Sequence, residues 1–126
     1  MNSKIESPKK FFPLRCKGAV GHWWSQRLTA VALIPLSIWL LLLMHYAFKA
    51  PYAETLAWLQ SPLNSLAIGA WTVLVMVHAA MGVQVVIEDY VSMLELRHWA
   101  IRLTNLVFLI LGVLALAFLI FISTAR

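Results

Sequence analysis

The sequence predicts an all-α integral membrane protein with three transmembrane helices and a cytoplasmic amino terminus. Three observations predict this fold class: an apolar composition, three long runs without charged residues, and an uneven distribution of Lys and Arg. Of the 126 residues, 62% are hydrophobic and 12% are charged, whereas soluble domains average roughly half apolar and a quarter charged. A chain of this length cannot bury so much apolar surface in its own core. We therefore expect lipid to be the solvent for most of the chain.

The runs without Asp, Glu, Lys or Arg cover residues 28–48, 63–87 and 103–125. Crossing a hydrocarbon core takes roughly 20 helical residues, and the backbone polar groups of a span must pair within the protein. Each run is therefore expected to form one transmembrane helix. Pro35 falls inside the first helix, where a proline favours a kink. The chain divides into a basic amino-terminal segment, residues 1–27, and a three-helix anchor, residues 28–126.

The segments between the predicted spans are short. Residues 49–62, with a proline at either edge, and residues 88–102 are expected to form connecting loops. Residues 1–27 are too basic to span a membrane and lack the apolar core and cleavage site of a signal peptide, so the first span is expected to be retained as an anchor. Cys16 is the single cysteine, which excludes an intrachain disulfide.

Lys and Arg accumulate on one side of the predicted membrane. Residues 1–27 contain six of them and residues 88–102 contain two, whereas the opposite side has only Lys49 and Arg126. The positive-inside rule then places the amino terminus and residues 88–102 in the cytoplasm and the carboxyl terminus outside. Because the positive residues adjoin apolar runs, the net charge of +5 indicates membrane orientation, and no nucleic-acid partner is expected.

His78 is an ionisable residue near the middle of the second predicted span. Such residues are usually functional, although a neutral imidazole also bonds to neighbouring helices. Helical periodicity places His78 on one stripe with Trp71, Gly82 and Asp89. Gly82 removes bulk where a porphyrin would approach, and imidazole is a common axial ligand of haem iron. The same stripe also fits a helix–helix seam, and both interpretations are open at this point.

His45 is the other histidine in a predicted span. It lies toward the outer end of the first span, whereas His78 lies on the cytoplasmic side of the middle of its own span. At 1.5 Å per residue, the two differ in depth by roughly 15 Å, too far to ligate one iron from opposite faces. If haem binds, its second ligand is expected from another polypeptide, and His45 is interpreted as an interfacial residue.

Asp89 and Tyr90 follow His78 by eleven and twelve residues, roughly 16 Å closer to the cytoplasm. A tyrosine at that depth is typical of the aromatic belt. The alternative is a quinone site, in which a phenol donates a hydrogen bond to a quinone carbonyl and a carboxylate relays protons. Arg27 lies at the same membrane edge, either as a positive-inside anchor or as the partner of a haem propionate.

Two motifs carry a resemblance to a known family. The stretch HWWSQRLTAVALIPLSIWLL opens the first span and HAAMGVQVVIEDYV closes the second. Together they resemble the D-type hydrophobic membrane anchor of succinate dehydrogenase, over nearly the whole chain from residue 21 onward. The resemblance rests on the order Arg–x–Thr–Ala, then His, then Asp-Tyr eleven and twelve residues later. It implies that His78 ligates a b-type haem shared with a second, C-type anchor subunit. It further implies that Arg27 lies near the haem propionates and that Asp89 and Tyr90 contribute to a ubiquinone site.

The resemblance also implies the remaining partners and the location. An iron–sulfur subunit and a flavoprotein subunit are expected on the cytoplasmic side of a bacterial inner membrane, with the carboxyl terminus in the periplasm. This chain itself would lack the succinate-oxidising site. It departs from some relatives in having Glu88 before Asp89 and Ser92 in place of a histidine. Two other interpretations are open: an anchor of fumarate reductase, and a small membrane scaffold or transporter component without haem.

Overall fold

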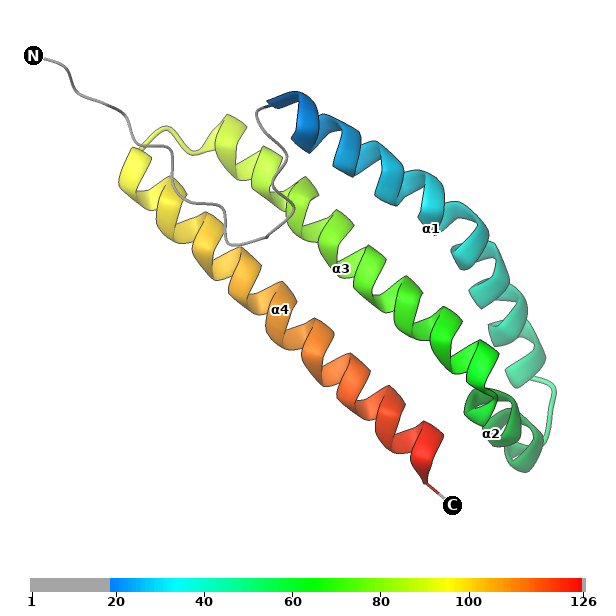
Figure 1. The fold of residues 1–126 in the computed structure, drawn as a ribbon. Coiled ribbons are helices and arrows are strands. Elements are labelled where there is room, and N and C mark those ends of the chain that lie inside the picture. The colour runs from blue at the N-terminus through cyan, green and yellow to red at the C-terminus, as the bar shows by residue number, and fades with distance from the viewer. Residues whose placement is uncertain (1–18, 126) are drawn as a thin grey trace, which may run out of the picture.

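The computed structural model describes residues 19–125 of the chain. These residues form four α-helices and no strand: α1 (Ala19–Ala47), α2 (Tyr52–Gln60), α3 (Pro62–Tyr90) and α4 (Leu94–Thr124) (Figure 1). The helices α1, α3 and α4 are long and apolar enough to cross a membrane, which confirms the predicted fold class. Cys16 and six of the ten Lys and Arg residues behind the predicted orientation lie outside the described residues. The orientation therefore stays a prediction.

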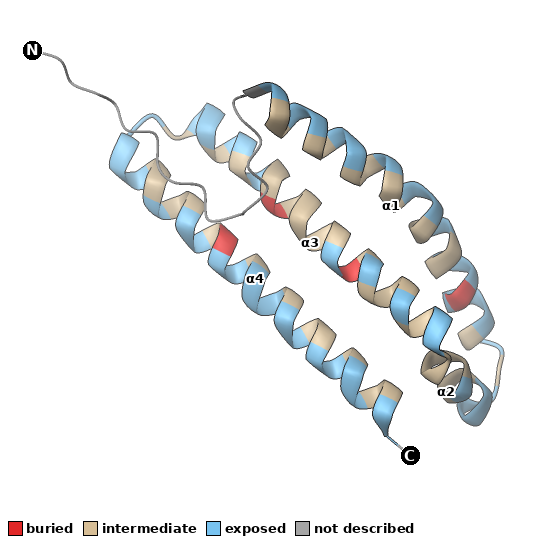
Figure 2. Ribbon diagram, viewed as in Figure 1, coloured by how far each residue is buried: buried red, intermediate tan, exposed pale blue. Residues whose placement is uncertain are grey.

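The three long helices lie side by side in a row with α3 in the middle (Figure 1). α3 packs against α1 on one side and α4 on the other, while α1 and α4 do not contact each other. A single row of helices has no enclosed interior. Only Leu43, Thr72, Ala80 and Asn105 are buried among the described residues (Figure 2). The remaining apolar side chains are left for lipid or for other helices, which suits a membrane but not water.

α1 begins before the charge-free run that predicted it. The apolar helix extends over Val20–Ala47, so the predicted boundary between residues 27 and 28 falls inside it. A helix does not have to end where the hydrocarbon ends, and Trp23, Trp24 and Arg27 are residues typical of the membrane interface. α1 continues through Pro35 and is bent along its length (Figure 1). Proline lacks the N–H of a helical hydrogen bond, which accounts for the bend.

The sequence predicted that the whole first connection, residues 49–62, is a loop. This prediction is wrong, because the connection contains the nine-residue helix α2. Pro51 precedes the helix, and Glu54 lies in its first turn, where a negative charge stabilises the helix dipole. α2 is held by tertiary contacts. Trp58 stacks on Trp39 of α1 with ring centroids 5.3 Å apart, and the Tyr46 hydroxyl donates a hydrogen bond to Glu54 over 3.2 Å. These contacts join α2 to another helix, which explains why the local pattern did not reveal it.

The second connection is shorter than predicted. α3 continues to Tyr90 and α4 begins at Leu94, so only three residues remain outside helices, in place of residues 88–102. Charged residues interrupted the apolar run without interrupting the helices, because a helix readily extends into the headgroup region. Arg97 donates a hydrogen bond from Nε to the Val91 carbonyl over 2.9 Å and closes the turn.

Candidate functional site

The stripe of α3 that carries His78 faces α1. His78 Nδ1 lies 2.9 Å from Thr29 Oγ1, and Trp71 Nε1 donates a hydrogen bond to Ser37 Oγ over 3.0 Å. Gln26 Nε2 lies 3.5 Å from the carbonyl oxygen of His78. These contacts run between α1 and α3 over several turns. Trp71 and His78 of the predicted stripe thus lie at the seam between the two helices.

Gly82 belongs to this seam as well. A Cβ atom added to it would lie 3.5 Å from Gln26 Nε2, so the space beside the glycine is taken by a side chain of α1. The structure favours the seam over the porphyrin clearance that the sequence had suggested for Gly82. Periodicity identifies which residues share a stripe, but it does not identify the neighbour that the stripe meets.

His78 has one ring nitrogen held and the other free. Nδ1 contacts Thr29, whereas Nε2 has no hydrogen bond to any residue in the range 19–125. The two nitrogens point to nearly opposite sides of the ring, so Nε2 is directed away from Thr29. An imidazole that is fixed through one nitrogen and free at the other suits an axial ligand of haem.

The described residues contain no group of three or more His, Cys, Asp or Glu side chains that would hold a metal ion. Haem iron is already held by the porphyrin and requires only an axial ligand from the protein. The residues present therefore fit a haem better than a bare metal ion.

His45 lies far from His78. It is exposed and sits in the last turn of α1, sixteen residues beyond Thr29, the contact of His78. That distance corresponds to roughly 24 Å along a helix. The separation agrees with the expectation that the two histidines do not share an iron.

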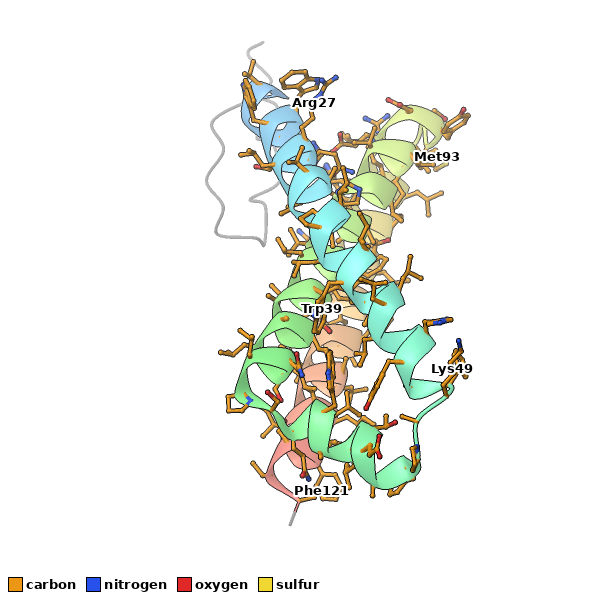
Figure 3. All side chains as sticks on the ribbon, turned by 90° about the vertical axis from the view of Figure 1, so that its right-hand side faces the viewer. Arg27, Trp39, Lys49, Met93 and Phe121 are labelled. Atoms are coloured by element: carbon orange, nitrogen blue, oxygen red, sulfur yellow. The ribbon has the colours of Figure 1, made fainter. Side chains whose placement is uncertain are left out.

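Arg27 is exposed near the amino-terminal end of α1. Its guanidinium carbon lies 4.0 Å from the centre of the Trp23 ring, in a cation–π contact. Figure 3 shows Arg27 at the same end of the row of helices as Met93, which precedes α4. No ion pair joins Arg27 to Asp89, although both are described. Arg27 thus lies at the same end of the row of helices as the turn between α3 and α4, and no acidic partner is seen for it among residues 19–125.

Asp89 and Tyr90 are the last two residues of α3, and both are exposed. Tyr90 is 84% exposed, and the neighbouring Glu88 accepts a hydrogen bond from Gln84 Nε2 over 2.7 Å. The helix rise places the pair roughly 16 to 18 Å beyond His78. The structure thus brings Arg27, Asp89 and Tyr90 to one end of the row and holds His78 deeper, without contact between Tyr90 and His78.

Sequence reasoning missed the polar face of α1. His22, Gln26 and Thr29 recur at the spacing of one helix face, and this face meets α3. Two of its atoms, His22 Nε2 and Gln26 Oε1, are buried and have no hydrogen-bond partner among residues 19–125. The spacing of three polar residues in an apolar helix was the available signal. Thr29 is also part of the Arg–x–Thr–Ala order that carries the family resemblance.

A groove between α3 and α4 has a volume of about 810 Å³. It lies at the opposite end of α3 from Asp89 and Tyr90, beside α2. Its lining is mostly apolar: Gln60, Pro62, Ser65, Leu66, Gly69, Ala70, Val73, Leu74, Leu116, Leu119, Ile120 and Ser123. The groove shares no residue with the candidate site around His78.

The family match and the most similar relatives indicate the same family for this chain. Residues 9–124 match the family described as succinate dehydrogenase/fumarate reductase transmembrane subunit. The succinate dehydrogenase hydrophobic membrane anchor subunit of Rickettsia bellii is 36% identical over 106 residues, which cover 83% of each chain. The corresponding protein of Rickettsia typhi is 32% identical over 108 residues, or 85% of each chain. No solved structure matches significantly.

The family match extends over all four helices and includes Arg27, His78, Asp89 and Tyr90. The three apolar helices agree with it, because the family consists of transmembrane subunits. The chain belongs to the family of transmembrane subunits of succinate dehydrogenase and fumarate reductase, as a multi-pass membrane anchor of such an enzyme complex.

Proposed function

We propose that this chain is the D-type anchor of a succinate:ubiquinone oxidoreductase, complex II. In this proposal His78 ligates a b-type haem shared with a second anchor subunit, and Asp89 and Tyr90 contribute to the ubiquinone site. The observation that carries the proposal is the state of His78. Its Nδ1 contacts Thr29 of α1 and its Nε2 has no hydrogen bond to a described residue, in a chain whose family anchors a redox enzyme.

The haem would be held by residues on two helices of this chain. His78 offers Nε2 to the iron, and Arg27, at the end of α1 that leads to the membrane edge, offers its guanidinium to a propionate. When bound, the haem supplies a one-electron carrier inside the membrane. Because His45 lies at the other end of α1, a second histidine ligand to the iron would come from the second anchor subunit.

The quinone head is assigned to the edge where α3 ends. Tyr90 is exposed there and donates a phenol hydrogen bond to a quinone carbonyl. Asp89, the adjacent exposed carboxylate, accepts protons from water and passes them toward the reduced ring. Quinone reduction consumes protons, so a site at the water–lipid boundary suits this chemistry better than one in the hydrocarbon core.

The remaining partners follow from this arrangement. An iron–sulfur subunit, bound on the cytoplasmic side, delivers electrons to the edge that carries Asp89 and Tyr90. A flavoprotein subunit bound to the iron–sulfur subunit oxidises succinate, and this chain takes no part in that step. The proposed location is a bacterial inner membrane, with the amino terminus in the cytoplasm and the carboxyl terminus in the periplasm, as the positive-inside rule indicates.

The test is a reduced-minus-oxidised optical spectrum of the purified complex that contains this chain. We expect a low-spin b-type haem signal in the wild type and loss of haem or a changed spin state in His78→Ala. His45→Ala is the matched control, because it removes an exposed histidine from the other end of α1 and should leave the spectrum unchanged. A wild-type complex without haem, or an unchanged low-spin spectrum in His78→Ala, contradicts the proposal.

A second measurement separates the proposal from the fumarate reductase alternative. The wild-type complex should reduce ubiquinone with succinate faster than it reduces fumarate with a quinol. The reverse ratio favours an anchor of fumarate reductase. His78→Ala should retain part of its quinone reductase activity, because electrons are able to pass from the iron–sulfur subunit to quinone without the haem.

A further inference from the structure

The contact between Thr29 and His78 has a definite hydrogen-bond direction. Thr29 Oγ1 lies 2.9 Å from the Ser25 carbonyl oxygen and 3.0 Å from the Gln26 carbonyl oxygen. It also lies 2.9 Å from His78 Nδ1. A hydroxyl has one hydrogen to donate and two lone pairs that accept. Thr29 Oγ1 therefore has three close polar neighbours but only one hydrogen to donate, so it must accept a hydrogen bond from at least one of them.

The Thr29 hydroxyl donates its hydrogen toward the two carbonyl oxygens. Carbonyls only accept, so both contacts would be oxygen–oxygen repulsions if Thr29 donated to the imidazole instead. A threonine inside a helix commonly donates to the carbonyl one turn earlier, as Thr29 does here. The lone pairs of Thr29 are then left facing His78, and the hydrogen of the third contact must come from Nδ1.

This direction selects one of the two neutral forms of the imidazole. A neutral histidine carries its proton on one nitrogen and a lone pair on the other. With the proton on Nδ1, the lone pair lies on Nε2, the nitrogen without a hydrogen bond to a described residue. Iron binds the lone pair, so only this tautomer ligates through Nε2.

We propose that Thr29 is a positioning residue that holds His78 in the tautomer able to ligate haem iron through Nε2. Thr29 reaches the imidazole from the neighbouring helix and fixes both its proton and its orientation. The proposal rests on the proposed function, since it assumes that His78 is a haem ligand. It goes beyond that function because it gives a role to a residue that does not itself contact the haem.

The hydrogen bond from His78 Nδ1 to Thr29 also changes how strongly the imidazole donates electrons to a metal. An Nδ1–H that donates to an oxygen makes the imidazole more basic, so Nε2 donates more electron density to the metal. Greater donation stabilises ferric over ferrous iron. Removal of the acceptor should therefore raise the midpoint potential of the haem and weaken haem binding, whereas a merely structural role of Thr29 would move neither in a defined direction.

The variant that isolates this effect is Thr29→Val, which keeps the shape of the side chain and deletes the hydroxyl. The intact complex is purified and measured for haem content, for the low-spin electron paramagnetic resonance spectrum and for midpoint potential. We expect haem affinity, measured as retention during washing, to fall by roughly 10- to 100-fold. This is the range observed when a residue that hydrogen-bonds to a metal-ligating histidine is removed. The remaining haem should show shifted g-values and a higher potential.

Two further variants serve as matched controls. Thr29→Ser keeps the hydroxyl and should restore the wild-type spectrum and potential. Thr72→Val removes a buried threonine of α3 that also donates to the carbonyl one turn earlier, but for which no histidine contact is seen among the described residues. It should leave the haem unchanged. If too little complex assembles with Thr29→Val, Thr29→Cys replaces the oxygen by a weak acceptor of similar size and should show the same changes.

The outcomes separate this proposal from the proposed function. Haem lost in His78→Ala but unchanged in Thr29→Val overturns the role of Thr29 and leaves His78 as the ligand. Equal changes in Thr29→Ser and Thr29→Val also overturn it, because the hydroxyl is then irrelevant. A wild-type complex without haem overturns both proposals together.

Discussion

Tyr90 is the last residue of α3, and its phenol is exposed. A belt tyrosine and a quinone-site tyrosine share this position, and they differ only in what the hydroxyl group does. A belt residue uses its ring as an amphipathic anchor. A quinone-site residue uses its O–H group as a donor, and that use strengthens as negative charge develops on the reduced ring.

Tyr90→Phe removes the donor and keeps the ring. We expect quinone reductase activity to fall by roughly 10- to 100-fold, because a hydrogen bond to a charged group contributes about 1.5–3 kcal/mol. Succinate oxidation with a soluble artificial acceptor should stay near normal. The measurement is the ratio of the two activities in the purified complex.

Tyr52→Phe is the control for this prediction. Tyr52 is 80% exposed and lies at the opposite end of the row of helices, in the first turn of α2. The Tyr52→Phe substitution should leave both quinone reductase activity and succinate oxidation with the artificial acceptor unchanged. Wild-type ubiquinone reduction and inhibitor affinity in Tyr90→Phe would show that Tyr90 is a belt residue only. Asp89→Asn should resemble Tyr90→Phe if the carboxylate relays protons.

At the level of the elements, α2 depends on contacts with other helices. It has nine residues, too few for a helix to be stable in isolation. Its capping residue Pro51 provides no side-chain hydrogen bond. The stack of Trp58 on Trp39 and the Gln60 hydrogen bond to the Ile122 carbonyl, 3.2 Å long, join α2 to α1 and α4. α2 therefore ties together two long helices that do not contact each other directly.

Trp58→Ala should loosen this end of the protein. An aromatic stack contributes about 0.5–1.5 kcal/mol beyond the burial of its surface, so the complex should unfold at a lower temperature. Trp58→Phe retains a ring and should lose less. Trp99→Ala removes a tryptophan that is 69% exposed and should have little effect. Equal melting temperatures for Trp58→Ala and Trp99→Ala would contradict a stabilising role of the stack.

At the level of the whole molecule, the three long helices form a single row in which most described residues are exposed or half-buried (Figure 2). Such a layer presents apolar side chains along its full length, and 35 large hydrophobic residues of the described chain are exposed when it stands alone. Lipid solvates these side chains, and other transmembrane helices are able to pack on them. The layer thus separates an edge with Asp89 and Tyr90 from an edge with α2, and the function proposed here requires the first edge to face the cytoplasm.

The orientation is tested by cysteine labelling in intact cells. In a Cys16→Ser background, Ala53→Cys in α2 and Ser92→Cys between α3 and α4 place thiols at opposite edges. A membrane-impermeant maleimide should label Ala53→Cys in intact cells and Ser92→Cys only after permeabilisation. The reverse pattern would contradict the predicted orientation and would place the edge with Asp89 and Tyr90 in the wrong compartment.

The positions of α1, α3 and α4 follow from the sequence alone. A helix in lipid satisfies its own backbone through local hydrogen bonds, so a charge-free run of sufficient length already specifies it. The same reasoning placed His78 inside the membrane and Asp89 and Tyr90 at its edge, and the order of these residues carried the family resemblance that the comparisons confirm.

The contacts of His78 and the existence of α2 depended on tertiary structure. Thr29 and His78 are 49 residues apart, and no local pattern states that these two side chains meet. Periodicity predicted the stripe of α3 but left open whether a porphyrin or a helix lies beside Gly82, and in the structure Gln26 of α1 lies there. α2 likewise forms through contacts with α1 and α4. Interactions between distant segments arise only once the helices pack, and they decide which nitrogen of His78 is left free.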